Sequence, residues 1–563
     1  MRPPAQRSFD PDLKLVAAIA SAVSLLSFLY YFQRGEILLY GDAVAHINIA
    51  RRVFDSQTPG LLQLGTVWLP LPHLLTIPFV VSDWMWRTGI GGSIPSMLAY
   101  VLGVMGIFRL TRGLLDRVES SRAQARVGGW LAAVIFSANP NLLYLQATAM
   151  TESLYLALFI WAVAYFAEFL RLTATSGDDA TFRRPLYRCA ACLAGAELTR
   201  YDGWFLTAAT GLVVFVMLLG RWSNRAFCVM ALKFLVGIAV APVLWLVYNG
   251  AVYGNPLEFA NGPYSAKAIE GRTAKPGYPA HPGAGNVITS ATFLLKSAEL
   301  DMAQGNWGRI WIAVALLGTL ASIKLGARGA VVLLWVPLLF YALSIAQSGV
   351  PLFLPAWWPF TWYNLRYGVQ LLPLFAVSAA LAGAAPQGAF QIFRSAPSLR
   401  GWPHTNLRFR GGLAVVLALV ALSYAFVWRA QPLCFTEAWI NSRTKLALES
   451  SVAKALADLP PDSRYLMYVG DHVGALQQAG VPLRQVINEG NHRPWKKPAD
   501  PDGLWEQALA DPARHVDFVI AYEGDAVDRG ADKKTLTLLT EIHASGQAAA
   551  RIYSAKIALN QSR

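Results

Sequence analysis

Runs of about twenty apolar residues recur along this chain, from Leu13 to about residue 429. An α-helix of that length is about 30 Å long, which matches the hydrocarbon core of a bilayer. Only 15% of the 563 residues are charged, whereas an ordinary soluble domain has about 25%. The first run, 13–33, follows a short basic tail and lacks a small-residue cleavage pattern, so it indicates an uncleaved anchor. The sequence therefore predicts an α-helical polytopic membrane protein.

The charged residues of the loops predict how the spans are threaded, because Lys and Arg favour the cytoplasmic side. One apolar piece, 67–86, decides the threading. A full span there would place the arginines between 109 and 126 outside, whereas its three prolines and flanking tryptophans favour an interfacial helix. With an interfacial helix every basic loop falls on one side. About eleven transmembrane helices are then expected, at 13–33, 94–112, 127–143, 150–170, 186–199, 204–220, 226–249, 307–324, 329–346, 366–386 and 411–429.

The last part of the chain, 437–563, differs from the rest. Short apolar runs that favour strands alternate there with amphipathic runs that favour helices, which is typical of a small α/β domain. Eleven spans from a cytoplasmic N-terminus place this domain outside. We therefore expect a membrane domain at 1–430, with long extracytoplasmic stretches at 34–93 and 250–306, and a C-terminal extracytoplasmic domain at 437–563, in a bacterial inner membrane.

Two polar stretches outside the spans are candidates for substrate contacts. The stretch 250–306 is rich in Gly and Pro, and long unstructured loops within compact folds are often lids. The stretch 488–497, which contains Trp495, either contacts an acceptor sugar or is a solvated loop.

The formal net charge of +14 does not indicate a nucleic-acid partner. Acidic and basic residues are nearly balanced in 437–563, so the positive excess lies in short loops between apolar runs, as the positive-inside rule describes. Cys189 and Cys192 form a CxxC within an apolar run, without a second pair that would complete a zinc site. These patterns predict no cofactor.

Asp42 lies immediately after the first span, where a helix is expected to begin. His46 follows one turn later, so the two side chains share a helix face. Two interpretations are open for Asp42, because Asp is a favoured N-cap and a carboxylate at the membrane face is also placed to act as a base. Asp42 and His46 together are too few ligands to support a metal site.

Three further corners on the predicted outer side carry charged groups near the membrane face. Charges at such depth are costly, so they usually form pairs or serve a function. Glu152 or Asp202 could form a salt bridge to Arg200 or Arg366 that holds the spans together, or could take part in chemistry. His73 is either a hydrogen-bonded interfacial residue or a ligand. The candidate substrate-binding residues are His46, His73, Glu152, Arg200, Tyr201, Asp202, Asn364, Arg366 and Tyr367.

These residues, in their order and sidedness, resemble the GT-C superfamily of membrane glycosyltransferases. The similarity is greatest to the family-39-type branch, which includes protein mannosyltransferases and the aminoarabinose transferases of lipid A. The pattern is a carboxylate after the first span, here Asp42, an amphipathic interface helix, and a second helix near a Pro-Leu-Pro, here Pro70–Pro72. Arg366-Tyr367 ahead of Pro373 is similar to an Arg-Tyr…Pro pattern of that branch, and Met150-Thr151-Glu152 resembles a corner of related mannosyltransferases. The resemblance covers roughly 13–386.

The resemblance implies a hexosyl or pentosyl transferase that takes a sugar from a polyprenyl phosphate. The sugar would pass, with inversion at the anomeric carbon, to a lipid, glycan or protein acceptor on the outer face of the membrane. Asp42 would be the base for the acceptor hydroxyl, and Arg200 and Arg366 would stabilise the leaving phosphate. Many relatives carry two adjacent acids after the first span, whereas Ala43 follows Asp42 here. A second acidic role therefore has no candidate.

Three other functions are compatible with a protein of this kind. A transporter or flippase of lipid-linked sugars often shows internal repeats, and no repeat is evident. An oligosaccharide ligase or oligosaccharyltransferase would use a diphosphate donor, and a compact cluster of outer acids would favour it, whereas the acids here are scattered along the sequence. A non-enzymatic assembly subunit would not depend on Asp42.

Overall fold

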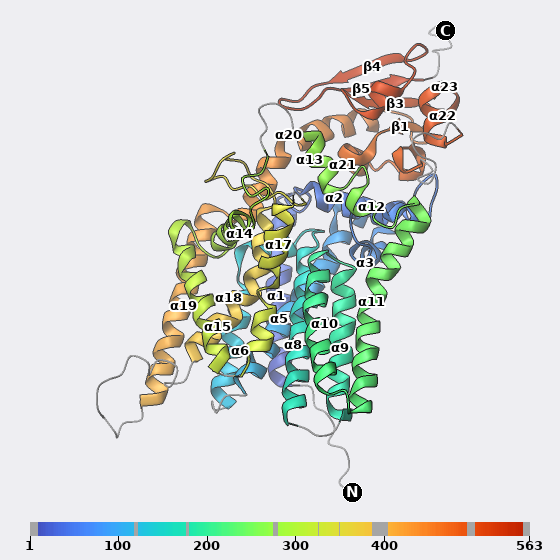
Figure 1. Cartoon of the computed structure of the whole chain (residues 1–563). Helices are drawn as coiled ribbons and strands as arrows, with labels where there is room; N and C mark the ends of the chain where they lie inside the picture. The colour runs from blue at the N-terminus through green and yellow to red at the C-terminus, as the bar shows by residue number, and fades with distance from the viewer. Residues whose placement is uncertain are drawn as a thin grey trace.

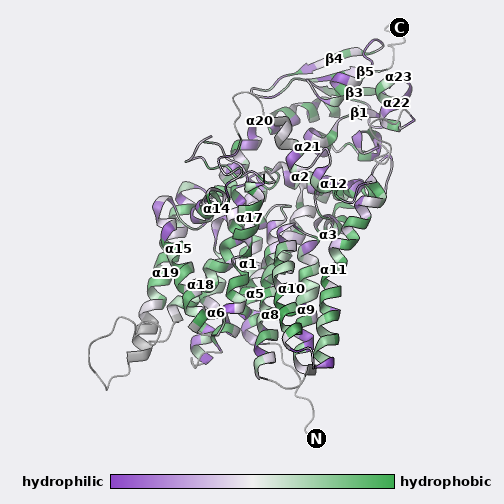
Figure 2. Cartoon of the chain, in the orientation of Figure 1, coloured by the Kyte–Doolittle hydropathy of each residue, from purple (hydrophilic) through white to green (hydrophobic). Residues whose placement is uncertain are grey.

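The computed structural model describes residues 10–116, 122–175, 179–273, 280–324, 326–347, 349–384, 404–491 and 502–555. A bundle of long helices makes up most of the molecule, and a small β-sheet with its own helices lies at one end (Figure 1). Hydrophobic residues predominate along the bundle, and hydrophilic residues gather towards the sheet (Figure 2). This distribution is typical of a membrane-embedded bundle with a polar end.

Within the described residues, nine helical segments are long and apolar enough to cross a membrane. Several are apolar on all sides, as expected for helices that face either lipid or other helices. They are α1 (Pro11–Gln33), α5 (Ile90–Leu115), α8 (Glu152–Thr175), α10 (Asp202–Gly220), α11 (Arg225–Tyr253), α15 (Gly308–Lys324), α16 (Arg328–Leu333) with α17 (Val336–Ala346), α18 (Leu372–Ala384) and α19 (His404–Ala430).

The two remaining predicted spans, 127–143 and 186–199, are also helical. They coincide with α6 (Arg122–Ser137), which ends before Pro140, and with α9 (Asp179–Glu197), whose first half is rich in arginine. Both belong to the bundle, because α6 packs on α5 and α18, and α9 packs on α8 and α11. The predicted polytopic helical fold is therefore confirmed.

The stretch 34–93 contains short helices rather than a span. The apolar piece at 67–86 forms a helix of ten residues, about 15 Å long, which is half the thickness of a hydrocarbon core. Arg51 in this stretch is buried and paired with Asp55 at 2.7 Å. The helices here are α2 (Gly41–Arg52), α3 (Leu71–Val80) and α4 (Asp83–Thr88).

The stretch 250–306, expected as a long loop, is partly helical. Its last third is an apolar run that forms α14, and α14 packs against α17 and the 3-10 helix η3 (Leu365–Leu371). The expectation of an unstructured, lid-like loop is therefore wrong for this last third of the stretch. The helices are α12 (Glu258–Asn261), α13 (Ala266–Thr273) and α14 (Val287–Met302).

The C-terminal part forms a five-stranded sheet of order β2-β1-β3-β5-β4. β1 is parallel to β2 and β3, whereas β5 is antiparallel to β3 and β4. The small C-terminal α/β unit is thus confirmed, although 492–497 of the polar stretch lie outside the described residues. Its elements are α20 (Leu433–Ala457), β1 (Tyr465–Met467), α21 (Val469–Ala479), β2 (Val486–Ile487), α22 (Leu504–Ala510), α23 (Pro512–His515), β3 (Phe518–Tyr522), α24 (Ala526–Gly530), β4 (Thr537–Ile542) and β5 (Ala550–Ser554).

Helix α2 lies between the bundle and the C-terminal unit, and hydrogen bonds join it to both. Tyr40, just before α2, donates its hydroxyl to the carbonyl of Cys434 at 2.9 Å. Asn48 of α2 donates to Gln477 Oε1 at 2.7 Å, and Gln477 donates in turn to the carbonyl of Trp86 at 2.8 Å. These contacts fix the junction at which the predicted site residues meet.

Candidate active site

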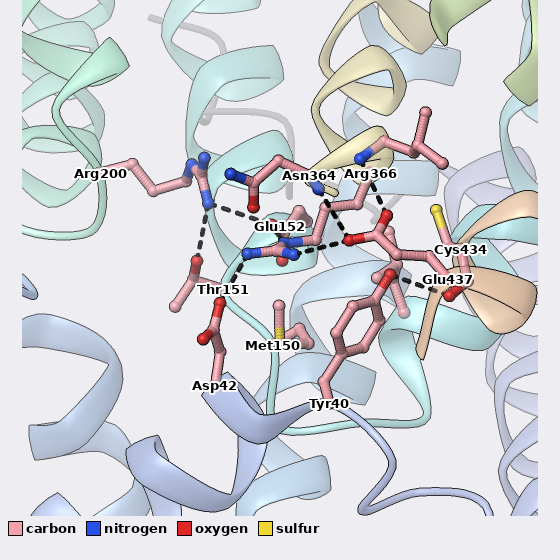
Figure 3. A network of polar contacts seen from close by, with 12 residues as sticks. Tyr40, Asp42, Met150, Thr151, Glu152, Arg200, Asn364, Arg366, Cys434 and Glu437 are labelled. Atoms are coloured by element: carbon pink, nitrogen blue, oxygen red, sulfur yellow. Dashed lines mark hydrogen bonds and ion pairs between the residues drawn. The ribbon is translucent and has the colours of Figure 1, made fainter. Parts of the chain in front are cut away.

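Asp42 is the second residue of α2, not its N-cap. The N-cap is Tyr40, and no side chain caps this helix, so the N-cap interpretation of Asp42 is wrong. The carboxylate instead points towards η3, where its Oδ2 accepts from Arg366 Nη2 at 2.6 Å (Figure 3). The Asp42 side chain keeps 38% of its surface exposed. It is therefore fixed on one side and accessible on the other.

Arg366 is the centre of a buried network of ion pairs (Figure 3). Besides Asp42, its Nε donates to Glu152 Oε1 and its Nη1 to Glu437 Oε1, each at 3.2 Å. The three carboxylates come from α2, α8 and α20, which are far apart in the sequence. The planar guanidinium can contact three acids because it carries five N–H donors in a fixed fork. Arg366 thus joins the bundle, α2 and the C-terminal unit at one point.

Arg200 extends the network from the loop before α10. Its Nη1 donates to Thr151 Oγ1 and Glu152 Oε1, both at 3.1 Å, so the two guanidinium groups share one oxygen of Glu152. Its Nη2 donates to the hydroxyl of Tyr341 at 2.7 Å. Tyr341 donates to Asp202 Oδ2 at 3.1 Å, and Arg200 Nε pairs with the same oxygen at 3.4 Å. The expected salt bridges therefore form.

Aromatic rings enclose both guanidinium groups. The ring of Tyr367 lies 5.2 Å from Arg200 Cζ and 5.2 Å from Arg366 Cζ, and it stacks on Tyr341. The ring of Tyr40 lies 5.1 Å from Arg366 Cζ. Cation–π contacts of this kind stabilise a charge that has lost its water. They also hold the guanidinium planes in one orientation.

Sequence reasoning missed Glu437. Its carboxylate accepts from the backbone N–H of Asn364 at 2.9 Å and of Leu365 at 2.8 Å. Asn364 has a φ of 58°, a left-handed conformation that Asn adopts more readily than most residues, and this turn aims the two N–H groups at Glu437. A single Glu on an amphipathic helix gives no local signal, because its role depends on a contact across more than seventy residues.

The network holds more negative than positive groups. Arg200 and Arg366 face four carboxylates, three of which are almost fully buried. Glu152 Oε2 and Asp202 Oδ1 have no hydrogen-bond partner. Asp42 is the exposed member, and it lines a cavity of about 220 Å³ together with η3 and one face of α20. Glu437 lines the same cavity but is only 2% exposed, so Asp42 is the most accessible of the four acids.

His46 and His73 form a separate buried pair beside the network. His46 Nδ1 lies 2.9 Å from His73 Nε2, and Trp68 packs against the His46 ring. Burial, and then the charges of Arg366 and Arg200, lower the pKa of His46 to about 3. Burial also holds the pKa of His73 well below its usual value. Both rings are thus neutral near pH 7, where one donates to the other.

Tyr201 faces away from the network. Its hydroxyl donates to the carbonyl of Val67 at 3.2 Å, and its ring stacks on Phe259. Within the described residues, no group of three or more His, Cys, Asp or Glu side chains is arranged to hold a metal ion. The structure brings together seven of the predicted site residues in the ion-pair network, and Tyr201 lies outside it. The seven are Asp42, Glu152, Arg200, Asp202, Asn364, Arg366 and Tyr367.

The sequence matches no family model and none of the curated proteins. The fold, in contrast, is similar to that of two solved structures of ArnT, so the predicted resemblance is confirmed for the fold alone. ArnT from Cupriavidus metallidurans bound to undecaprenyl phosphate superposes with a TM-score of 0.54 at 14% identity, covering 98% of this chain and 99% of ArnT. Apo ArnT gives 0.53 at 15% identity, with 96% and 97% covered.

An archaeal oligosaccharyltransferase, AglB from Archaeoglobus fulgidus in complex with an inhibitory peptide and a dolichol-phosphate, is a more distant neighbour. It gives a TM-score of 0.46 at 13% identity, and the match covers 98% of this chain and 75% of AglB. That superposition is too loose to bear on function.

Proposed function

We propose that this protein is a membrane glycosyltransferase that moves a sugar from a polyprenyl phosphate to an acceptor hydroxyl, with Asp42 as the base. One observation carries the proposal: Asp42 is the only exposed acid of a buried ion-pair network, and it lines a cavity. ArnT, which shares the fold, binds undecaprenyl phosphate. We place the reaction at the outer face of a bacterial inner membrane, as the loop charges predict.

The proposed reaction is a single inverting displacement. The acceptor oxygen attacks the anomeric carbon and loses its proton to Asp42. The bond from that carbon to the phosphate oxygen breaks, and its electron pair leaves with the polyprenyl phosphate. Because Arg366 holds Oδ2 of Asp42, the proton goes to Oδ1. A base held in place needs no reorganisation when the acceptor arrives.

Arg366 and Arg200 can fix the acids and also assist the leaving phosphate. Each guanidinium carries five N–H groups. Arg366 uses one at each of its three nitrogens, which leaves two N–H groups for phosphate oxygens. Donors that are already oriented stabilise a developing negative charge most effectively.

An oligosaccharide ligase and a transporter of lipid-linked sugars are the alternatives. The four acids, scattered along the sequence, do cluster around Arg200 and Arg366 in the structure, which favours the ligase more than the sequence did. Transporter sites lie near the membrane midplane between repeats. This network instead joins η3 to α2 and α20, and both helices lie between the bundle and the sheet (Figure 1). That position supports transfer over transport.

The test is transfer from a panel of radiolabelled polyprenyl-phosphate sugars by the purified full-length protein. We expect Asp42→Asn to lower transfer about 10²- to 10⁴-fold, the usual contribution of a general base, without loss of folding. Asp462→Asn, which changes an exposed residue, is the matched control and should transfer like wild type. If wild type uses none of these donors, or if Asp42→Asn transfers normally, the proposal is wrong.

A further inference from the structure

One face of α20 extends the cavity beyond Asp42. Residues four or eight positions apart share a face of an α-helix. Glu437, Asn441, Lys445 and Glu449 follow that spacing, and all four line the cavity that contains Asp42. The row from Glu437 to Glu449 is about 18 Å long at 1.5 Å per residue. It leads from the ion-pair network into the C-terminal unit.

A second cavity continues this row. It has a volume of about 240 Å³, and it shares Leu38, Val44, Leu446 and Glu449 with the first. Its far wall is α21, which packs on both α20 and α2. The two cavities adjoin at these four side chains, and together, from Asp42 to α21, we call them the α20 groove.

Two buried side chains in the α20 groove have polar atoms without hydrogen-bond partners. They are Ser442 Oγ and Glu449 Oε1, in residues that are only 6% and 2% exposed. The charges nearest to Glu449 Oε1, Lys445 Nζ at 3.8 Å and His472 Nδ1 at 3.9 Å, are beyond hydrogen-bond distance. An unpaired buried oxygen is costly, so these groups are suited to a ligand that supplies donors.

The amide side chains of Asn441 and Gln477, in the same walls, already make hydrogen bonds within the protein. Asn441 donates to the carbonyl of Trp362 at 2.9 Å, and Gln477 is hydrogen-bonded to Asn48 and Trp86. These amides build the walls, whereas Ser442 Oγ and Glu449 Oε1 have no partner in the protein. The contrast is what a binding site requires, because the walls must be rigid and the contact groups free.

We propose that the α20 groove is the acceptor subsite, and that the acceptor is a glycan whose hydroxyls donate to Glu449 and Ser442 while its terminal hydroxyl lies at Asp42. This inference rests on the proposed function. A glycan offers hydroxyls at every ring along the groove, and the aliphatic side chains Leu38, Val44 and Leu446 match the apolar faces of sugar rings. A Ser- or Thr-containing peptide would present one hydroxyl at Asp42 and one backbone N–H donor per residue along the groove, whereas each sugar ring offers several hydroxyls.

The test measures binding without a donor. Full-length protein in nanodiscs is titrated with a panel of di- to tetrasaccharides, and with Ser/Thr peptides of similar length. We expect at least one oligosaccharide to bind wild type. Glu449→Gln should weaken its affinity about tenfold, because an amide oxygen accepts less strongly than a carboxylate. Ser442→Ala should weaken it about threefold, because one hydrogen bond is lost. Glu523→Gln, an exposed glutamate of the same unit, should bind like wild type, and thermal unfolding shows that each variant is folded.

Three outcomes overturn the inference. They are the absence of oligosaccharide binding, equal affinities of wild type and Glu449→Gln, and peptide binding that depends on Glu449. Because no donor is present, binding and transfer fail independently. Glycan binding that depends on Glu449, without transfer from any donor, contradicts the proposed function alone. Transfer with an acceptor KM that Glu449→Gln leaves unchanged contradicts the α20 groove alone.

Discussion

The ion-pair network and the α20 groove are adjacent, yet their polar groups are arranged in opposite ways. In the network, Arg366 contacts three carboxylates, and rings cover its faces. In the groove, Ser442 and Glu449 are as deeply buried but leave oxygens unpaired. Paired charges fix a geometry, whereas unpaired groups accept a ligand. Asp42 and Glu437 belong to both regions, and we assign the chemistry to Asp42 because it is the exposed one of the two.

The largest expected effect on stability comes from Arg366→Met. The substitution removes the charge that faces Asp42, Glu152 and Glu437, and breaking a buried ion pair costs about 3–5 kcal/mol. We expect a large fall in the thermal unfolding temperature in detergent. Arg514→Met, which breaks an ion pair whose arginine is 82% exposed, should leave that temperature nearly unchanged. Equal shifts for the two variants would contradict the network.

Arg366→Lys separates charge from geometry. Lysine keeps the positive charge but cannot contact three acids in one plane. We expect transfer to fall about 10- to 100-fold through loss of one charged hydrogen bond, with a smaller loss of stability than for Arg366→Met. Steady-state transfer rates and thermal unfolding measure the two effects. Wild-type transfer by Arg366→Lys would show that the shape of the guanidinium has no positioning role.

Glu437→Gln tests the contact that joins α20 to η3. The amide can accept from only one of the two backbone N–H groups that Glu437 now receives, and an unsatisfied buried group costs about 1–3 kcal/mol. We therefore expect a moderate fall in unfolding temperature and a partial loss of transfer. Glu541→Gln, in an exposed pair with Arg551, is the control. If Glu437→Gln behaves like wild type, as the Glu541→Gln control should, Glu437 does not hold the turn at Asn364.

The smallest expected effect is the pH dependence from His46 and His73. Since burial lowers their folded pKa values, the unfolded chain binds more protons below its own pKa of about 6.5. Their contribution to stability is thus complete above about pH 6.5 and decreases as the pH falls towards the folded pKa of His46, about 3. The loss for His46 is up to about 1.4 kcal/mol per pH unit.

His46→Gln should flatten this pH dependence of the unfolding temperature. The exposed His543 is the matched site, and His543→Gln should leave the slope unchanged. A slope that His46→Gln leaves as steep as in wild type would show that His46 is not a buried neutral base.

Local signals made much of the fold predictable. Each span is an apolar run, and a helix of that composition forms wherever the run is long enough for a bilayer. Loop charge then placed Asp42, Glu152 and Arg366 on one side. These residues do meet, because helix ends at the same end of a bundle lie close together.

The rest depends on contacts that the sequence does not encode locally. Glu437 resembles any charge on an amphipathic helix until α20 folds back on η3. His46 shares a helix face with Asp42, as predicted, but it pairs with His73 of α3. The α20 groove likewise requires α2 and α21 to lie beside α20.

The most direct test of the central distinction is to measure kcat and the acceptor KM for wild type, Asp42→Asn and Glu449→Gln with one polyprenyl-phosphate donor. The account predicts that Asp42→Asn lowers kcat with little change in KM, because the base acts only as the proton moves. It predicts that Glu449→Gln raises KM with little change in kcat, because that carboxylate holds the acceptor throughout. If both variants change the same constant, the division between a positioning network and a binding groove is wrong.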